Sequence, residues 1–156
     1  FIDKDITMRD YLSEIISSFR EISKKNFNLN FDQYSNDKKI TKSIEIVYGL
    51  RNFIGNANKF SKNSIYINLK SDSEFTEITI EDDGNGYPKD VLSKIGEPYL
   101  RSNDPIDKSK TGLGLGLFIG KTLLEKNFAS INCRNSKTRT GAEVIIKWNN
   151  KDLFNI

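Results

Sequence analysis

One stretch of the sequence organises the rest of the chain, Thr111-Gly112-Leu113-Gly114-Leu115-Gly116-Leu117-Phe118-Ile119, in which three glycines alternate with leucines. Glycine lets a backbone approach a ligand closely. The start of a helix offers unpaired N–H groups and the positive end of its dipole to an anion. We therefore predict a glycine-rich turn ahead of a helix over residues 115–126, placed to bind phosphate. Close packing without any ligand explains the same glycines, so the choice depends on the rest of the chain.

The composition limits the classes of function. A chain of 156 residues with 37% hydrophobic and 29% charged residues is typical of one soluble globular domain. The net charge of +3, with basic and acidic residues interspersed, disfavours nucleic acid as a partner. One cysteine, Cys133, excludes a disulfide framework, and the absence of histidine excludes histidine-ligated zinc and histidine bases. Because the chain begins at Phe1 rather than methionine, we expect it to be a piece of a longer protein.

Hydrophobic periodicity predicts an α+β fold. Segments with apolar residues at helical spacing alternate with segments of period two, and the first helix begins at a capping pair, Thr7 and Asp10. The predicted helices cover residues 7–25, 40–60, 88–95 and 115–126, and the predicted strands cover residues 27–31, 64–70, 75–81, 131–133 and 144–148. Strands 64–70 and 75–81 form a hairpin. We expect a two-layer α/β sandwich formed by residues 1–156 as a single domain, with one mixed, mostly antiparallel sheet and helices on one face.

The helix over residues 40–60 carries polar residues that do not help it to form. Asn52, Asn56 and Lys59 share one face, away from the apolar stripe, and Gly49 and Gly55 each cost about 1 kcal/mol relative to alanine. Residues that disfavour the helix in which they lie are expected at functional sites. The amide oxygen of Asn56 suits Mg²⁺, while Asn52 and Lys59 suit phosphates. A solvated helix face is the alternative interpretation.

The strand over residues 75–81 runs into an acidic, glycine-rich segment. Asp82 is followed by Gly84 and Gly86, which open the backbone beside its carboxylate. A carboxylate accepts a hydrogen bond from the exocyclic amine of adenine, which guanine lacks at that position. An ordinary acidic turn has the same composition. Phe60 could lie against a base or belong to the core.

The segment over residues 96–110 is long and polar. It contains Pro98 and Pro105 and carries the cations Arg101, Lys108 and Lys110. Loops of this length are usually functional lids or disordered. The cations could hold a γ-phosphate or simply be solvated on the surface.

Taken together and in this order, these motifs resemble the ATP-binding domain of sensor histidine kinases, a branch of the GHKL ATPases with the Bergerat fold. The similar segments are Asn52-Phe-Ile-Gly-Asn56-Ala-Asn-Lys59-Phe60 (N box), Asp82-Asp83-Gly84-Asn85-Gly86 (G1 box), Glu97-Pro98-Tyr99 (F box), Gly112-Leu-Gly114-Leu-Gly116-Leu (G2 box) and Gly141-Ala142-Glu143-Val144 (a third glycine turn). Finer features, such as Gly96-Glu-Pro-Tyr99, are similar to the RegB/PrrB kind of redox-responding kinase.

The resemblance implies a function and a set of site residues. It implies binding of Mg·ATP and transfer of the γ-phosphate to a histidine on the protein's own N-terminal dimerisation domain, in two-component signalling. A response regulator would be the indirect partner, and the full-length protein would be anchored in the bacterial inner membrane, with this piece in the cytoplasm. The implied catalytic residues are Asn52, Asn56 and Lys59, with Asn56 on the metal. The implied ATP-binding residues add Phe60, Asp82, Gly84, Gly86, Tyr99, Arg101, Lys110, Thr111, Gly112, Leu113, Gly114, Leu115 and Gly116.

The sequence departs from the family pattern at two positions, and three alternative functions stay open. Gly55 stands where hydrolytic members of the superfamily place a water-activating glutamate, and Ala142 replaces a frequent threonine. The chain also lacks a histidine to accept phosphate, so it cannot autophosphorylate alone. The alternatives are another GHKL protein kinase or slow ATPase, a catalytically silent nucleotide-binding docking module, and a nucleic-acid-binding domain.

Overall fold

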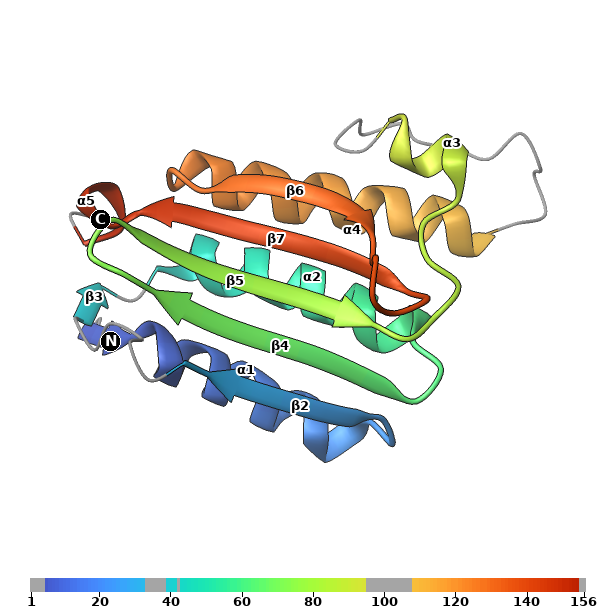
Figure 1. Cartoon of the computed structure of the whole chain (residues 1–156), viewed down its shortest axis with the longest axis horizontal. Helices are drawn as coiled ribbons and strands as arrows, with labels where there is room; N and C mark the ends of the chain where they lie inside the picture. Colours follow the sequence, from blue (N-terminus) through green and yellow to red (C-terminus); the bar gives the residue numbers. More distant parts are fainter. Residues whose placement is uncertain (1–4, 33–38, 42, 95–107, 155–156) are drawn as a thin grey trace.

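A mixed sheet of five strands has one face covered by helices α1, α2 and α4 (Figure 1). The computed structural model describes residues 5–32, 39–41, 43–94 and 108–154, and in the last range it describes side chains from Leu115 onward. Across the sheet the strands are β2 Asn26–Phe31, β4 Ser64–Ser71, β5 Phe75–Asp82, β7 Ala142–Asn149 and β6 Ser130–Asn135. The helices on it are α1 Met8–Ile22, α2 Ile44–Phe60 and α4 Lys108–Lys126. Shorter elements are β1 Asp5–Thr7, β3 Lys39–Thr41, α3 Lys89–Leu92 and α5 Asn150–Leu153.

The sheet combines one parallel pair with three antiparallel pairs. β2 runs parallel to β4, and each remaining pair is antiparallel. The β4–β5 hairpin matches the prediction, and the carboxylate of Asp72 accepts the backbone N–H groups of Glu74 and Phe75, both at 2.8 Å, within its turn. Alternate residues of the strands, Trp148 of β7 among them, point towards the helices. They form the core together with buried helix residues such as Phe53 of α2. The predicted fold class is confirmed.

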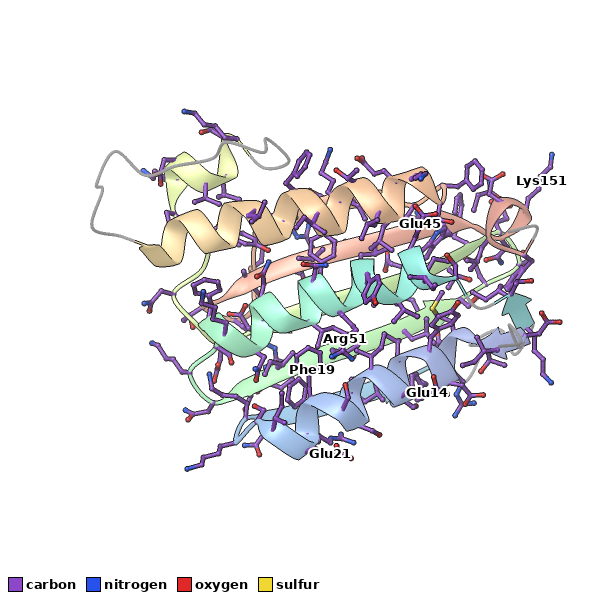
Figure 2. All side chains as sticks on the ribbon, turned by 180° about the vertical axis from the view of Figure 1, so that it is seen from behind. Glu14, Phe19, Glu21, Glu45, Arg51 and Lys151 are labelled. Carbon is purple, nitrogen blue, oxygen red and sulfur yellow. The ribbon has the colours of Figure 1, made fainter. Side chains whose placement is uncertain are left out.

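Helix α1 begins at the predicted cap, because Thr7 Oγ1 accepts the backbone N–H of Asp10 at 3.2 Å. It packs beside α2 through the Phe19 and Arg51 side chains, which meet between the two helices in Figure 2. The Arg51 guanidinium lies 5.1 Å from the Phe19 ring centre and donates to Ser18 Oγ at 2.8 Å. The contact combines an aromatic–cation interaction with a hydrogen bond.

Helix α2 begins later than the pattern indicates. The predicted start at Ile40 is wrong, because Ile40 lies in β3 and pairs with Ile6 of β1 in a second, two-stranded sheet. Both isoleucines are buried, so Ile40 belongs to the core as expected but comes from a strand. Strands of three residues provide too little alternation to be recognised in a sequence. The helix begins after Ser43, whose Oγ accepts the N–H of Ile46.

Helix α4 begins earlier than predicted. It starts at Lys108, so the expected turn over Gly112–Gly116 is a helix instead, and residues 108–110 of the expected lid are helical. The glycines allow α4 to lie close against α2. A Cβ added to Gly120 would lie 2.7 Å from a Phe53 ring carbon, and one added to Gly49 would lie 2.6 Å from Leu124 Cγ. This packing outweighs the low helix propensity of glycine. The rest of the predicted lid, residues 96–107, lies outside the described residues.

Three segments end at the same edge of the sheet. The arrowhead of β5, the turn between β6 and β7, and the connection from α2 to β4 lie together at the right of Figure 1. The short helix α3 follows β5 at this edge, as the pattern over residues 88–95 predicts. This edge therefore gathers the residues singled out in the sequence.

Candidate functional site

Asp82 is the last residue of β5 and its side chain is buried, with 4% exposed. One carboxylate oxygen, Oδ1, accepts the backbone N–H of Gly84 at 2.8 Å and that of Ala142 at 3.3 Å. Burial raises the pKa of Asp82 above its usual value, and the two N–H bonds offset only part of that rise. The structure thus places a buried carboxylate of fixed orientation at the sheet edge, as expected for an acceptor.

The two glycines after Asp82 are required by their surroundings. A Cβ on Gly84 would collide with the backbone carbonyl of Phe60, the last residue of α2. Gly86 has a φ of +80°, and a Cβ there would lie 2.6 Å from Asn135 Oδ1. The Asn135 amide also holds the next residue: its Oδ1 accepts the N–H of Tyr87 at 2.6 Å and its Nδ2 donates to the Tyr87 carbonyl at 3.2 Å. The backbone beyond Asp82 is therefore fixed on both sides.

Asp83 has a structural task. Its carboxylate accepts the backbone N–H of Lys62 at 2.8 Å and that of Asn63 at 3.1 Å, which ties the start of β4 to the end of β5. Desolvation would raise the pKa of Asp83, but backbone hydrogen bonds from Asn63, Ser64 and Lys62 together hold it below its usual value. Adjacent aspartates thus have separate roles.

Asn56 has an unusual environment in α2. Its Nδ2 atom is buried without a hydrogen-bond partner, and Gly116 of α4 lies directly against the amide. A Cβ on Gly116 would lie 2.8 Å from Asn56 Oδ1 and 2.9 Å from Nδ2. An unsatisfied buried amide is costly and calls for an explanation. A ligand oxygen that accepts from this NH₂ group, such as that of a phosphate or of a water bound to Mg²⁺, would supply one.

The donor set fits magnesium better than a transition metal. Among the residues that the structure describes, no group of three or more His, Cys, Asp or Glu side chains is arranged to hold a metal. Mg²⁺ needs few protein ligands, because waters and substrate phosphates complete its octahedron. A single amide oxygen from Asn56 satisfies that requirement.

The other predicted residues of α2 lie at its surface. The Asn52 Nδ2 donates to the carbonyl of Tyr48, one turn earlier, at 2.7 Å. Lys59 is exposed, with its Nζ 5.2 Å from the ring centre of Phe60, which is half-buried. Asn52 and Lys59 are thus available to a ligand from solvent, and their predicted roles remain predictions.

The remaining predicted site residues belong to the lid and to α4. Tyr99 and Arg101 lie outside the described residues. The backbone from Lys110 through Gly114 is helical, Leu115 is 51% exposed and Gly116 contacts Asn56. Because α4 begins at Lys108, the N–H groups without intrahelical partners belong to its first four residues rather than to Gly112–Gly116. The expectation that amides of a Gly112–Gly116 turn are free for phosphate is therefore wrong for this conformation.

Sequence reasoning missed two residues of this edge. Asn135, 48 positions from Tyr87 in the sequence, forms hydrogen bonds with the Tyr87 backbone. Glu81, directly before Asp82, is buried against the β6–β7 turn. The sequence signal for Glu81 is a charged residue directly before Asp82, at the end of the predicted strand over residues 75–81. Asn135 carries no sequence signal, because its partner is a distant backbone.

Cys133 lies in β6 and its side chain contacts the buried Tyr87. Burial raises the pKa of the Cys133 thiol to about 11, and a hydrogen bond with Tyr87 opposes that rise. Thiolate is the reactive form, so the raised pKa disfavours reaction of this thiol at neutral pH. This supports its interpretation as a small apolar side chain packed against the core.

Comparison with known proteins assigns the family. Residues 41–152 match the model of the histidine kinase-, DNA gyrase B- and HSP90-like ATPases. The chain therefore belongs to this family of ATPases. No helix in the described part of the chain is both long and apolar enough to cross a membrane.

Relatives within the family are sensor histidine kinases. The chain is 36% identical over 124 residues to the sensor histidine kinase RegB of Cereibacter sphaeroides, covering 70% of this chain and 27% of RegB. It is 27% identical over 128 residues to a putative sensor histidine kinase, NtrY-like, of Rickettsia bellii, covering 81% of this chain and 20% of that protein. The chain thus spans about a quarter of the length of the curated relatives it matches. The prediction of an ATP-binding domain of the sensor histidine kinase class, similar to RegB, is confirmed.

Solved structures confirm the fold. The catalytic domain of histidine kinase ThkA superposes with a TM-score of 0.74 at 18% identity, covering 96% of this chain and 97% of that one. The mycobacterial sensor histidine kinase MprB gives 0.69 at 18% identity, covering 95% and 97%. The two-layer α+β architecture is therefore that of histidine kinase catalytic domains.

Proposed function

We propose that this chain binds Mg·ATP and donates its γ-phosphate to a histidine on a separate helical dimerisation domain. The observation that carries this proposal is Asp82, whose buried carboxylate is oriented by two backbone N–H groups at the edge of the sheet. A fixed acceptor of that kind suits the exocyclic amine of adenine. Because the chain contains no histidine, the phosphate acceptor must lie outside it. The expected acceptor is the protein's own N-terminal domain, with a response-regulator aspartate after it.

The roles proposed for the site residues are supported by the positions of the described ones and, for Tyr99 and Arg101, by the family resemblance alone. Asp82 recognises adenine, Gly84 and Gly86 let the base approach the backbone, and Phe60 lies beside it. Asn56, whose amide lies against Gly116 of α4, would hold the metal through its Oδ1 and donate from Nδ2 to a phosphate or a metal-bound water. The residues proposed to meet phosphates are Asn52, Lys59, Tyr99, Arg101, Lys110, Thr111, Gly112, Leu113, Gly114, Leu115 and Gly116. The contribution of Gly112–Gly116 requires the first turns of α4 to unwind.

Catalysis by this chain consists of positioning and charge neutralisation. When bound, Mg²⁺ neutralises charge on the phosphates. Asp82 would fix the adenine base, and Asn56 would fix the phosphates through the metal ion. The exposed Lys59 would neutralise negative charge on the phosphates. Holding the γ-phosphate in line with an incoming imidazole converts an encounter between domains into an oriented step. Gly55 offers no carboxylate to activate water, so we expect slow hydrolysis of ATP.

The test of nucleotide binding is calorimetric titration with ATP and GTP, each with and without Mg²⁺. We expect magnesium-dependent binding that prefers ATP. The variant Asn56→Ala should lower affinity for Mg·ATP about tenfold or more while changing metal-free ATP binding little, because Asn56 acts through the metal. Equal losses with and without metal would assign Asn56 to packing alone. Absence of any nucleotide binding would favour the silent docking module.

The test of phosphate transfer mixes this chain, Mg·ATP and the histidine-bearing helical domain of the same protein. Appearance of acid-labile phosphohistidine on that domain is the expected result. Phosphate on a serine of a partner, or release of inorganic phosphate alone, would instead favour another GHKL kinase or ATPase. Strongly salt-dependent binding to DNA would favour the nucleic-acid-binding alternative.

The organisation of the whole protein is part of the proposal. Residues 1–156 would be the single ATP-binding catalytic domain, acting in the cytoplasm, and other parts of the full-length protein would anchor it in the bacterial inner membrane. Limited proteolysis of the full-length protein should release a fragment that contains the five-stranded sheet and its helices and still binds Mg·ATP.

A further inference from the structure

The turn between β6 and β7 contacts the end of β5 on both faces of the sheet. Successive residues of a strand point to opposite faces, so Glu81 lies on the open face and Asp82 on the face towards the helices. Figure 1 shows this turn curling past the arrowhead of β5. The same short segment therefore touches Glu81 and Asp82 from opposite sides.

On the open face, Glu81 is almost fully buried beneath the turn, with 6% exposed. The Ser136 hydroxyl donates to Glu81 Oε2, and Thr138 Oγ1 lies 3.4 Å from the same oxygen. Arg139 Nε lies 3.7 Å from Glu81 Oε1, and the Arg139 guanidinium stacks 3.5 Å from the ring centre of Tyr66. Three residues of the turn thus converge on one carboxylate.

On the other face, the same turn contacts Asp82 through its backbone. Gly141 lies so close to Asp82 that a Cβ would collide with the Asp82 carbonyl and carboxylate. The next residue, Ala142, donates its N–H to Asp82 Oδ1. The turn is closed by a hydrogen bond from the Ser136 N–H to the Gly141 carbonyl at 2.8 Å. Because Ala142 begins β7 directly after the turn, displacement of the turn would shift one of the two N–H groups that orient Asp82.

Sheet stability alone does not explain a glutamate at position 81. Its cross-strand neighbour is Glu143, also buried, and like charges on facing positions are destabilising. Glu143 pairs with Arg134, which joins β7 to β6 only. Glu81 instead joins β5 to the turn. The pair therefore offers two carboxylates of similar burial on one face. Within the part of the chain that the structure describes, Glu81 contacts the side chains of the turn and Glu143 contacts Arg134 instead.

We propose that Glu81 is a positioning residue for adenine recognition, which holds the β6–β7 turn in place so that Ala142, the first residue of β7 after the turn, keeps its N–H on the carboxylate of Asp82. This inference rests on the proposed function, because it assigns Asp82 to the base. Removal of Glu81 should weaken recognition of the exocyclic amine more than it weakens binding of the phosphates. General loss of stability would weaken both together.

The experiment compares Glu81→Val with Glu143→Val as its matched control. The affinity of each variant for Mg·ATP and for Mg·inosine triphosphate, which lacks the exocyclic amine, is measured by calorimetry. Glu81→Val should reduce the preference for ATP about fivefold, within the range of effects transmitted by neighbouring residues. Glu143→Val should leave the preference unchanged. Ser136→Ala, which keeps Glu81 and removes one bond to it, should reduce the preference in the same direction and serves if Glu81→Val does not fold.

Hydrogen exchange without nucleotide provides a second readout. The Ala142 amide, bonded to Asp82, should exchange faster in Glu81→Val and Ser136→Ala but not in Glu143→Val. Glu81→Gln retains an acceptor for Ser136 and should restore most of the protection. Unchanged ATP preference in both folded turn variants would overturn the role of Glu81, as would an equal loss in Glu143→Val. If the wild-type protein binds Mg·ATP but does not prefer it over inosine triphosphate, the proposed role of Asp82 fails first, and this inference with it.

Discussion

At the scale of single residues, the carboxylate of Asp82 has two distinct oxygens. Oδ1 accepts two backbone N–H groups, and in the proposed function the second oxygen, Oδ2, is the one that would accept the amine of the base. An asparagine at this position can keep the Oδ1 contacts while presenting an NH₂ group in place of the second oxygen. The residue is therefore suited to a substitution that changes recognition without disturbing the fold.

Asp82→Asn should lower affinity for Mg·ATP about tenfold or more, since hydrogen bonds to charged groups contribute about 1.5–3 kcal/mol. Affinity for inosine triphosphate should rise relative to ATP, because the new NH₂ group can donate to the 6-oxo group. Calorimetry gives the affinities, and thermal unfolding gives the control for folding. Unchanged ATP affinity in a folded variant would remove Asp82 from the site.

The pKa of Asp82 predicts a pH dependence. Because burial raises this pKa, the folded protein takes up the proton at a higher pH than the unfolded chain does. The stability contributed by that proton is complete below the unfolded-state pKa and is lost as pH rises through the folded-state pKa. ATP affinity should change in the opposite direction: it should fall as pH falls through the raised pKa, because protonation removes the acceptor. Calorimetry from pH 7 downwards, with Asp82→Asn as the insensitive control, measures this; identical pH profiles would contradict it.

At the scale of elements, the contact between α2 and α4 depends on where glycine is required. Gly120 faces the Phe53 ring with no room for a Cβ, whereas a Cβ on Gly55 would make an ordinary contact, 3.6 Å from Phe19 Cζ. The two glycines therefore differ in what they contribute, although both lie inside helices.

Gly120→Ala and Gly55→Ala should change stability in opposite directions. Gly55→Ala should add about 0.5–1 kcal/mol, the helix-propensity gain. Gly120→Ala should lose about 1 kcal/mol net, because overpacking costs about 1–3 kcal/mol against the same gain. Urea unfolding of both variants measures the difference. Equal stabilisation by the two alanines would mean that α4 does not pack as closely as described.

An element could be predicted from the sequence when the residues that determine it lie close together in the chain. The β4–β5 hairpin and the Thr7 cap were predicted because their patterns lie within a few residues. The start of α4 was not, because its helical glycines are stabilised by contacts with α2. For the site, Asp82 and Asn56 were proposed from residue type, spacing and the family resemblance, and their roles remain predictions. Asn135 and Glu81 act through partners about 50 positions away. Tertiary partners of that kind leave no periodic trace in a sequence.

At the scale of the whole molecule, the proposed ligand would connect elements that are far apart in the chain. Asp82 ends β5, Asn56 lies in α2 and Gly116 lies in α4, so one nucleotide would contact the sheet and two helices. A ligand that binds only the folded state stabilises it by mass action. Binding of the nucleotide should therefore raise the free energy of global unfolding.

Mg·ATP at about a hundred times its Kd should stabilise the protein by about 2.7 kcal/mol. For a chain of this size that corresponds to a rise in Tm of about 5–10 °C. Differential scanning fluorimetry with Mg·ATP, with ATP and EDTA, and with Mg²⁺ alone measures it. Only the first should give the full rise; an equal rise with EDTA would show that the metal is not held by the protein.

The fixed orientation of Asp82 also bears on how quickly a ligand can enter. An acceptor already held by backbone N–H groups needs no rearrangement when a base arrives, so the barrier to docking is diffusion and desolvation. Adenosine, without any phosphate, should then associate about as fast as ATP and differ chiefly in how soon it leaves. Small heteroaromatic amines with one N–H donor would share that fast entry, which makes this corner of the fold a natural starting point for fragment-based inhibitors.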